Sequence, residues 1–127
     1  MIRRTITAAV VLPLLLAACS SAGSSAADVD YTSAKAIAAA IDKGGYACAG
    51  WTPNTEVMGA REDGTCDHSG TSVSVTTFNS AEQMAQINKV IAPMMSGVYV
   101  AGDKWQVNLP DKEQATAVQK IIGGDVK

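Results

Sequence analysis

Few large apolar side chains are available to build a core, and this scarcity limits the chain to a small, simply layered fold. After Cys19 the sequence contains a single leucine, Leu109, and a single phenylalanine, Phe78, so Val, Ile, Met and Ala must fill the interior. A domain of about 100 residues buries roughly 60 to 70% of the surface of its unfolded chain. Because small side chains leave a thin margin of stability, a covalent cross-link would matter to this fold.

The charge balance argues against partners that are strongly anionic. The chain has 10 Lys plus Arg and 12 Asp plus Glu. From Cys19 onward there are 8 basic and 12 acidic residues, a net charge of 8 − 12 = −4. Nucleic acids and anionic membrane surfaces both attract clustered Lys or Arg. We therefore expect no nucleic-acid partner, and no membrane adsorption that depends on basic residues.

Residues 1–18 have the pattern of an export signal. The pair Arg3-Arg4 precedes an apolar stretch from Ala8 to Ala18, which is shorter than the ~20 residues that span a bilayer as a helix. The segment Leu16-Ala17-Ala18-Cys19 then resembles the lipobox of bacterial lipoproteins. In that family signal peptidase II cleaves before the cysteine, which carries a diacylglycerol. The resemblance implies a lipid anchor on Cys19, on the extracytoplasmic face of the cell membrane, with the general secretion route as the means of export.

The expected organisation is a signal peptide at 1–18, a lipidated cysteine with a flexible tether at 19–30, and one α+β domain at 31–127. The tether from Ser20 to Asp30 is small and polar, and eleven such residues have a reach of roughly 15 to 20 Å. The alternative is an ordinary secreted protein in which Cys19 pairs with another thiol. Without Cys19 the remaining cysteines form an even pair, which favours lipidation.

Apolar periodicity predicts eight elements in the order α-β-β-β-α-β-β-α. The first helix begins after Thr32 or Ser33 and ends at Gly44-Gly45, with Ala34, Ile37, Ala38 and Ile41 on its buried face. Tyr46 to Thr55 is interpreted as an irregular connection. Strands are expected at Val57 to Glu62, closed by a tight turn at Asp63-Gly64, around Cys66, and at Thr71 to Phe78 after a turn at Ser69-Gly70.

The second half predicts two more helices around a hairpin. Ser80 caps a helix that Pro93 ends, with a buried stripe of Ala81, Met84, Ile87 and Ile91. Val98 to Ala101 and Lys104 to Leu109 form the hairpin, and Asp111 starts the last helix. Each strand pattern has one apolar face. We therefore expect one antiparallel sheet of about four to five strands with helices packed on one face.

Cys48 and Cys66 are the thiols that remain after lipidation, and outside the cytoplasm they are expected to form a disulfide. The bridge would close a loop of 18 residues. The alternative is a metal site of both thiolates, His68 and a carboxylate, Asp67 or Asp63, although zinc ligands usually come in closer pairs. We expect no metal and no cofactor beyond the lipid on Cys19.

His68 is the only histidine, so any catalysis by a histidine base must use it. It lies in a predicted turn, where a solvated side chain is the simpler interpretation. Glu62, Asp63 and Asp67 lie near it in sequence and could form a glycosidase pair or a weak calcium site, but their spacing does not match an EF-hand loop. Because no set of titratable groups converges in the sequence, we expect no catalytic residue.

Trp51, Met94 and Met95 are large apolar residues outside clear periodic elements. They either fold back over the thin core or form an exposed surface for a partner, since aromatic and Met side chains are enriched in interfaces. In the second case, these three residues form the candidate partner surface.

Three segments, Gly64-Thr65-Cys66, Val73 to Phe78 and Gly102 to Val107, are similar to a pattern of small disulfide-containing lipoproteins of Gram-positive bacteria. Such proteins mostly have no assigned activity, and no functional residue follows from the similarity. The expected function is non-catalytic binding of an envelope protein or cell-wall component. The alternatives are a small hydrolase or metal-dependent enzyme centred on His68, and a carrier of a small apolar ligand.

Overall fold

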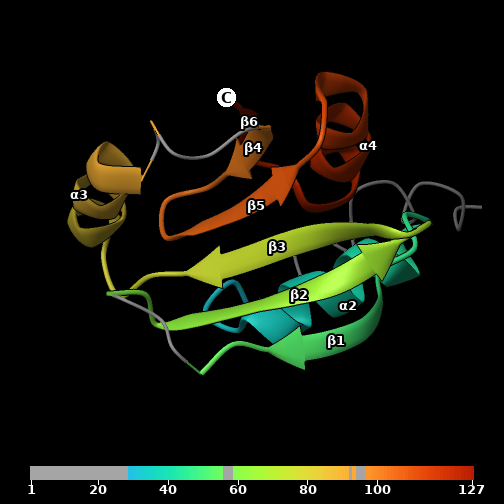
Figure 1. The fold of residues 1–127 in the computed structure, drawn as a ribbon, viewed down its shortest axis with the longest axis horizontal. Helices are drawn as coiled ribbons and strands as arrows, with labels where there is room; N and C mark the ends of the chain where they lie inside the picture. Colours follow the sequence, from blue (N-terminus) through green and yellow to red (C-terminus); the bar gives the residue numbers. More distant parts are fainter. Residues whose placement is uncertain (1–28, 56–58, 92, 94–96) are drawn as a thin grey trace, which may run out of the picture.

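The structure, a computed structural model, describes residues 29–55, 59–91, 93 and 97–127. These residues form a single sheet and three helices (Figure 1). The elements in chain order are α2 (Ala34–Lys43), β1 (Ala49–Pro53), β2 (Glu62–His68), β3 (Thr71–Thr77), α3 (Ala81–Ile91), β4 (Val98–Ala101), β5 (Trp105–Leu109), α4 (Lys112–Ile122) and β6 (Asp125–Val126).

All six strands pair antiparallel, in the order β1-β2-β3-β5-β4-β6. The α+β class and the antiparallel sheet are therefore as predicted, whereas the number of strands exceeds the expected four to five. The turn at Ser69-Gly70 is confirmed. Both residues have positive φ, 50° and 84°, as a two-residue hairpin turn of type I′ requires.

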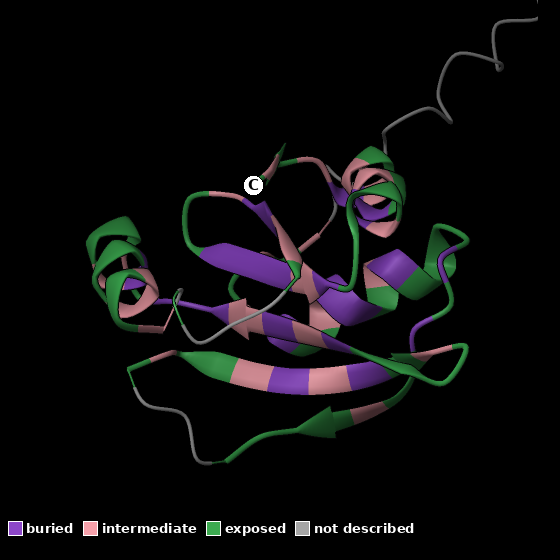
Figure 2. Ribbon diagram, turned by 45° about the horizontal axis from the view of Figure 1, so that its top comes forward, coloured by how far each residue is buried: buried purple, intermediate pink, exposed green. Residues whose placement is uncertain are grey.

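One face of the sheet carries the core. Alternate residues of β3 and β5 are fully buried there, among them Val73, Val75, Val107 and Leu109 (Figure 2). Helix α2 packs against β2 and β3, and α4 packs against β4 and β5. The stripe predicted for α2 is buried as expected. Because successive strand residues point to opposite faces, the other face of these strands is left polar.

The N-termini of all three described helices are completed by side chains. Ser33 accepts a hydrogen bond from the Ala36 N–H, Ser80 accepts one from the Gln83 N–H, and Asp111 accepts one from the Gln114 N–H. All three caps were predicted, and each satisfies a backbone donor that has no partner within its helix.

Helix α3 packs on the opposite face of the sheet from α2 and α4, so the prediction that all helices share one face is wrong. Its Asn88 donates a hydrogen bond to Gln106 on that second face, 3.0 Å away. Met84 packs in a small separate cluster with Phe78 and Ala101. The alternation of β4 places Ala101 on the face opposite to Val100.

The apolar stripe of α3 is also less buried than predicted. Met84 is buried, but Ile87 and Ile91 are half-buried and Ala81 is exposed. Val90 is 69% exposed. A helix that covers only the end of a sheet has too small a partner surface to bury a full stripe.

The first strands differ most from the prediction. The stretch expected to be irregular, Tyr46 to Thr55, contains β1, and the expected tight turn at Asp63-Gly64 lies inside β2. Of the described part of the expected strand Val57 to Glu62, only Glu62 belongs to a strand. Val57 itself lies outside the described residues.

Gly64 is in β2 because Trp51 of the neighbouring strand occupies the place of its side chain. A Cβ on Gly64 would collide with Cζ2 and Cη2 of the Trp51 indole and would lie 2.8 Å from the carbonyl oxygen of Thr52. Packing an aromatic ring over a strand glycine compensates for the missing side chain. The glycine that suggested a turn therefore serves a packing contact.

Strand β1 forms one edge of the sheet, and its geometry is irregular. Its register with β2 shifts between Ala49 and Thr52, Gly50 has a φ of 63°, and Pro53 removes a backbone donor. The opposite edge is β6, which has only two residues. Bulges, prolines and short strands are features that hinder pairing with a further strand.

Thr77 carries a buried hydroxyl whose effect on stability can be tested. Among the described residues, its hydroxyl is the one buried side-chain N or O atom without a hydrogen-bond partner. Thr77→Val keeps the shape and removes this unpaired group, so we expect the free energy of unfolding to rise by about 1 kcal/mol in urea denaturation. Thr76→Val is the matched control. It removes a hydroxyl that donates to Asp63 at 2.7 Å and should lower stability by about 1 kcal/mol. A loss of stability in Thr77→Val would contradict the assignment.

Candidate functional site

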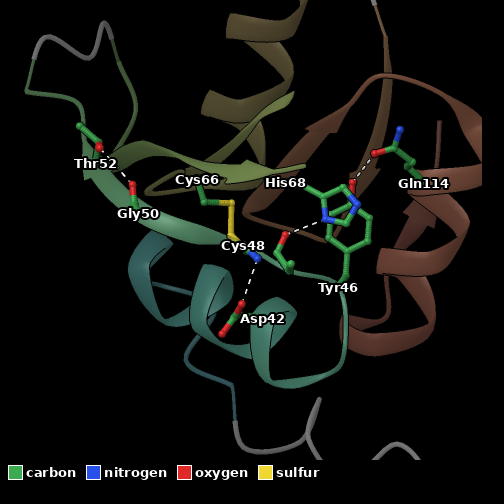
Figure 3. The surroundings of a disulfide bond; sticks show 9 residues. Asp42, Tyr46, Cys48, Gly50, Thr52, Cys66, His68 and Gln114 are labelled. Atoms are coloured by element: carbon green, nitrogen blue, oxygen red, sulfur yellow. Dashed lines mark hydrogen bonds between the residues drawn. A yellow bond between two sulfur atoms is a disulfide. The ribbon is translucent and has the colours of Figure 1, made fainter. Parts of the chain in front are cut away.

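Cys48 and Cys66 form a disulfide, as predicted. Their Cα atoms are 5.1 Å apart, and the bridge joins the residue before β1 to the middle of β2 (Figure 3). Both half-cystines are buried. The alternative of a metal site is wrong for these residues, because sulfurs bonded to each other cannot ligate as thiolates. In the part of the chain that the structure describes, no three His, Cys, Asp or Glu side chains are grouped to hold a metal ion.

His68 lies in a packed arrangement beside the disulfide, and not in the solvated turn that the sequence suggested. Its ring stacks on Tyr46 with centroids 3.7 Å apart and an interplanar angle of 6°. Its Nδ1 lies 2.8 Å from the Ala47 carbonyl oxygen. A neutral imidazole donates through that nitrogen, which leaves Nε2 as the acceptor.

The same arrangement reaches α4 through Tyr46. The phenol donates a hydrogen bond to Oε1 of Gln114 (Figure 3). Nε2 of Gln114 in turn donates to Asp111. Burial raises the pKa of Tyr46, and the negative charge of Asp111 raises it further. These contacts join the strand β2, the segment before β1 and helix α4. They give His68 a structural role that needs no reaction to explain it.

The three carboxylates near His68 do not converge. Glu62 and Asp63 are neighbours in a strand, so their side chains point to opposite faces. Glu62 accepts a hydrogen bond from the Ala34 N–H at the start of α2, at 3.1 Å. Asp67 accepts one from the Gly70 N–H in the hairpin turn. A glycosidase pair needs two carboxyl groups that face one substrate, and these residues do not provide it.

Asp63 is held by three polar side chains. Its Oδ1 accepts hydrogen bonds from Thr76 at 2.7 Å and Ser74 at 3.5 Å. Its Oδ2 accepts one from the Asn54 amide at 3.1 Å, and the Asn54 backbone N–H donates to the Asp63 carbonyl at 2.9 Å. Asn54, the first residue after β1, is thereby fixed to β2.

Trp51 lines a cleft where β1 ends and β2 begins. The indole is half-buried and packs against the edge of the main core. Beyond it opens a cleft of about 400 Å³, a size within the range of small-molecule sites. We call it the Trp51 cleft. Its lining residues are Trp51, Pro53, Asn54, Thr55, Ala60, Arg61, Glu62 and Asp63.

Arg61 is the cationic residue that lines the cleft. No sequence pattern pointed to it. Its backbone N–H donates to the Thr77 carbonyl at 2.8 Å, whereas its guanidinium makes no hydrogen bond or ion pair within the described residues. The pKa of Asp30 is lowered by hydrogen bonds from Thr32 and, to a smaller extent, by the charge of Arg61. Arg61 therefore lies within electrostatic reach of the residues where the predicted tether meets the domain.

The other two residues of the candidate partner surface, Met94 and Met95, lie outside the described residues, as does Cys19. Trp51 packs against the main core and also forms one wall of the cleft. Its role in a partner surface stays a prediction. Comparison of the chain with protein-family models, curated proteins and solved structures gives no match. Within the described ranges, no helix is long and apolar enough to cross a bilayer.

Proposed function

We propose that the protein is a lipoprotein anchored through Cys19 on the extracytoplasmic face of the cell membrane, where its domain binds an envelope component without catalysis. The observation that carries the proposal is the disulfide between Cys48 and Cys66. The chain has three cysteines. Pairing of two leaves Cys19 at the end of its lipobox-like segment, and a disulfide is typical of an oxidising compartment.

The binding role rests on the Trp51 cleft. A half-buried aromatic wall beside fixed polar side chains is a common arrangement in ligand sites. The carboxylates of Glu62 and Asp63 point apart and already accept hydrogen bonds within the protein. This arrangement favours recognition over acid–base chemistry, which needs groups that converge on a reacting atom.

Cys19→Ser tests the anchor. In cells fed a radioactive or clickable fatty acid, the native chain is expected to incorporate label and to sediment with membranes. The variant should lose the label and the membrane association, because two or more acyl chains are needed for stable anchoring. Cys48→Ala is the matched control, since it removes a cysteine outside the lipobox and should keep the label. Equal labelling of native protein and Cys19→Ser would contradict the proposal.

A further inference from the structure

The residues that line the Trp51 cleft indicate which chemical class of ligand it binds. The inference rests on the proposed binding role. The cleft is partly open to solvent, and its apolar part consists of Trp51, Pro53 and Ala60. It offers one aromatic wall with polar groups beside it.

The aromatic wall has a fixed position. The six-membered ring of Trp51 occupies the space above Gly64, and the backbone beneath prevents it from sinking further. The exposed remainder of the indole therefore cannot be withdrawn without loss of this packing. A rigid apolar surface of this kind binds a flat apolar ligand face with little loss of conformational entropy.

The polar groups offer both donors and acceptors. The guanidinium of Arg61 has five N–H donors and no hydrogen-bond partner within the described residues. Glu62 lies two residues before Gly64 and so on the strand face that the Trp51 ring covers. It supplies carboxylate oxygens with lone pairs beyond the hydrogen bond already made. A hydroxyl can donate to a carboxylate and accept from a guanidinium at the same time, so the cleft is suited to a ligand rich in hydroxyls.

The charges favour a neutral ligand. Arg61 opposes the approach of a cation to the Trp51 face, although an aromatic ring alone would attract one. The Glu62 carboxylate, on the same face as Trp51, opposes an anion. A ligand with an apolar face, many hydroxyls and no net charge meets all of these conditions, and a pyranose ring has C–H groups on its face and hydroxyls around its edge.

We propose that the Trp51 cleft binds a neutral saccharide chain, with one sugar ring against Trp51 and its hydroxyls hydrogen-bonded to Arg61 and Glu62. The glycan of a cell wall and free oligosaccharide share this chemistry.

The test is a titration of the full chain, in detergent, with a soluble tetramer of β-1,4-linked N-acetylglucosamine, followed by tryptophan fluorescence. The chain has two tryptophans. Trp105 is 6% exposed and stacked on Tyr31, so its emission should stay constant while that of Trp51 changes. We expect a saturable change. Arg61→Gln should weaken binding about tenfold or more, as expected for loss of a charged donor.

Two further variants complete the test. Lys104→Gln removes an exposed cation from the turn between β4 and β5 and should leave binding within about twofold of the native value. Trp51→Ala should abolish binding. Because it also removes packing, its thermal unfolding is measured first, and Arg61→Gln keeps the test valid if Trp51→Ala does not fold.

The inference is overturned by a folded native chain that shows no saturable change, or by equal binding in the native chain and Arg61→Gln. Binding of a lysine-rich peptide in place of the tetramer would assign the cleft to a cationic partner. To distinguish this failure from failure of the proposed function, retention of the fatty-acid label on Cys19 is measured on the same preparation. The fatty-acid label tests whether Cys19 is lipidated, and the titration tests whether the Trp51 cleft binds a saccharide.

To separate the two sources of ligand, the same titration is repeated as a pull-down with insoluble cell-wall glycan freed of protein. Retention of the native chain but not of Arg61→Gln would assign the cleft to the wall polymer. Binding of the soluble tetramer without retention on the wall would assign it to free oligosaccharide. Both results support a saccharide ligand, and retention of both proteins alike would contradict the role of Arg61.

Discussion

Replacing both Cys48 and Cys66 by alanine is expected to lower the free energy of unfolding by about 3 kcal/mol. The bridge closes a loop of 18 residues, and in the chain-entropy model such a cross-link acts by restricting the unfolded chain. The effect is large for this domain because small domains have total stabilities of only about 5 to 15 kcal/mol. Urea denaturation of the oxidised native protein and of the double variant measures it.

The bridge also fixes the edge of the sheet. It ties the residue before β1 to β2, close to the stacked pair Tyr46 and His68. We therefore expect the double variant to lose protection from hydrogen exchange in β1 before it does so in β5. Cys19→Ser is the control, because it removes a cysteine outside the bridge and should leave the urea midpoint unchanged. A loss below about 1 kcal/mol would mean that the unfolded chain is already compact without the bridge.

Leu109→Ala is expected to destabilise the domain by about 3 kcal/mol. Leu109 is 1% exposed at the end of β5, in the core that includes Ala115 and Val118 of α4. Truncating a buried leucine removes apolar contacts and leaves a cavity that its neighbours fill only in part. With so few large side chains in the core, little is available to move into that space.

Val90→Ala is the matched control for Leu109→Ala. Val90 lies on α3 and is 69% exposed, so its truncation should change stability by less than about 0.5 kcal/mol. Both variants are compared by urea denaturation with a common slope. If Leu109→Ala cost no more than Val90→Ala, the layer between the sheet and α4 would have to be looser than the burial of its residues indicates.

The predictability of each element depended on whether its signal was local. Helix α2 and strand β5 follow from apolar periods that the chain itself displays, and both were placed correctly. Strand β2 was not, because Asp63-Gly64 carries a strong local turn signal that a contact with Trp51 overrides. The face that α3 covers was also not predictable, since it depends on the alternation that puts Phe78 and Ala101 on the second face of the sheet.

The candidate site was predictable in part for the same reason. The disulfide follows from the number of cysteines and from the interpretation of Cys19, neither of which requires a fold. Trp51 was selected as an aromatic residue in an irregular context. Arg61 was not, because an isolated arginine has no pattern, and its place beside Trp51 results from the pairing of β1 with β2.

The irregular edge of the sheet has a consequence if the proposed lipid anchor on Cys19 holds the protein at a membrane. Anchored proteins diffuse in two dimensions, so the local concentration of neighbouring copies is far higher than in solution. An open strand would then recruit a strand from the next copy and start an aggregate. The shifted register of β1, its Pro53 and the two-residue β6 at the other edge hinder such recruitment. If Cys19 carries the proposed lipid anchor, these edges would hinder crowded copies on one bilayer from joining strand to strand.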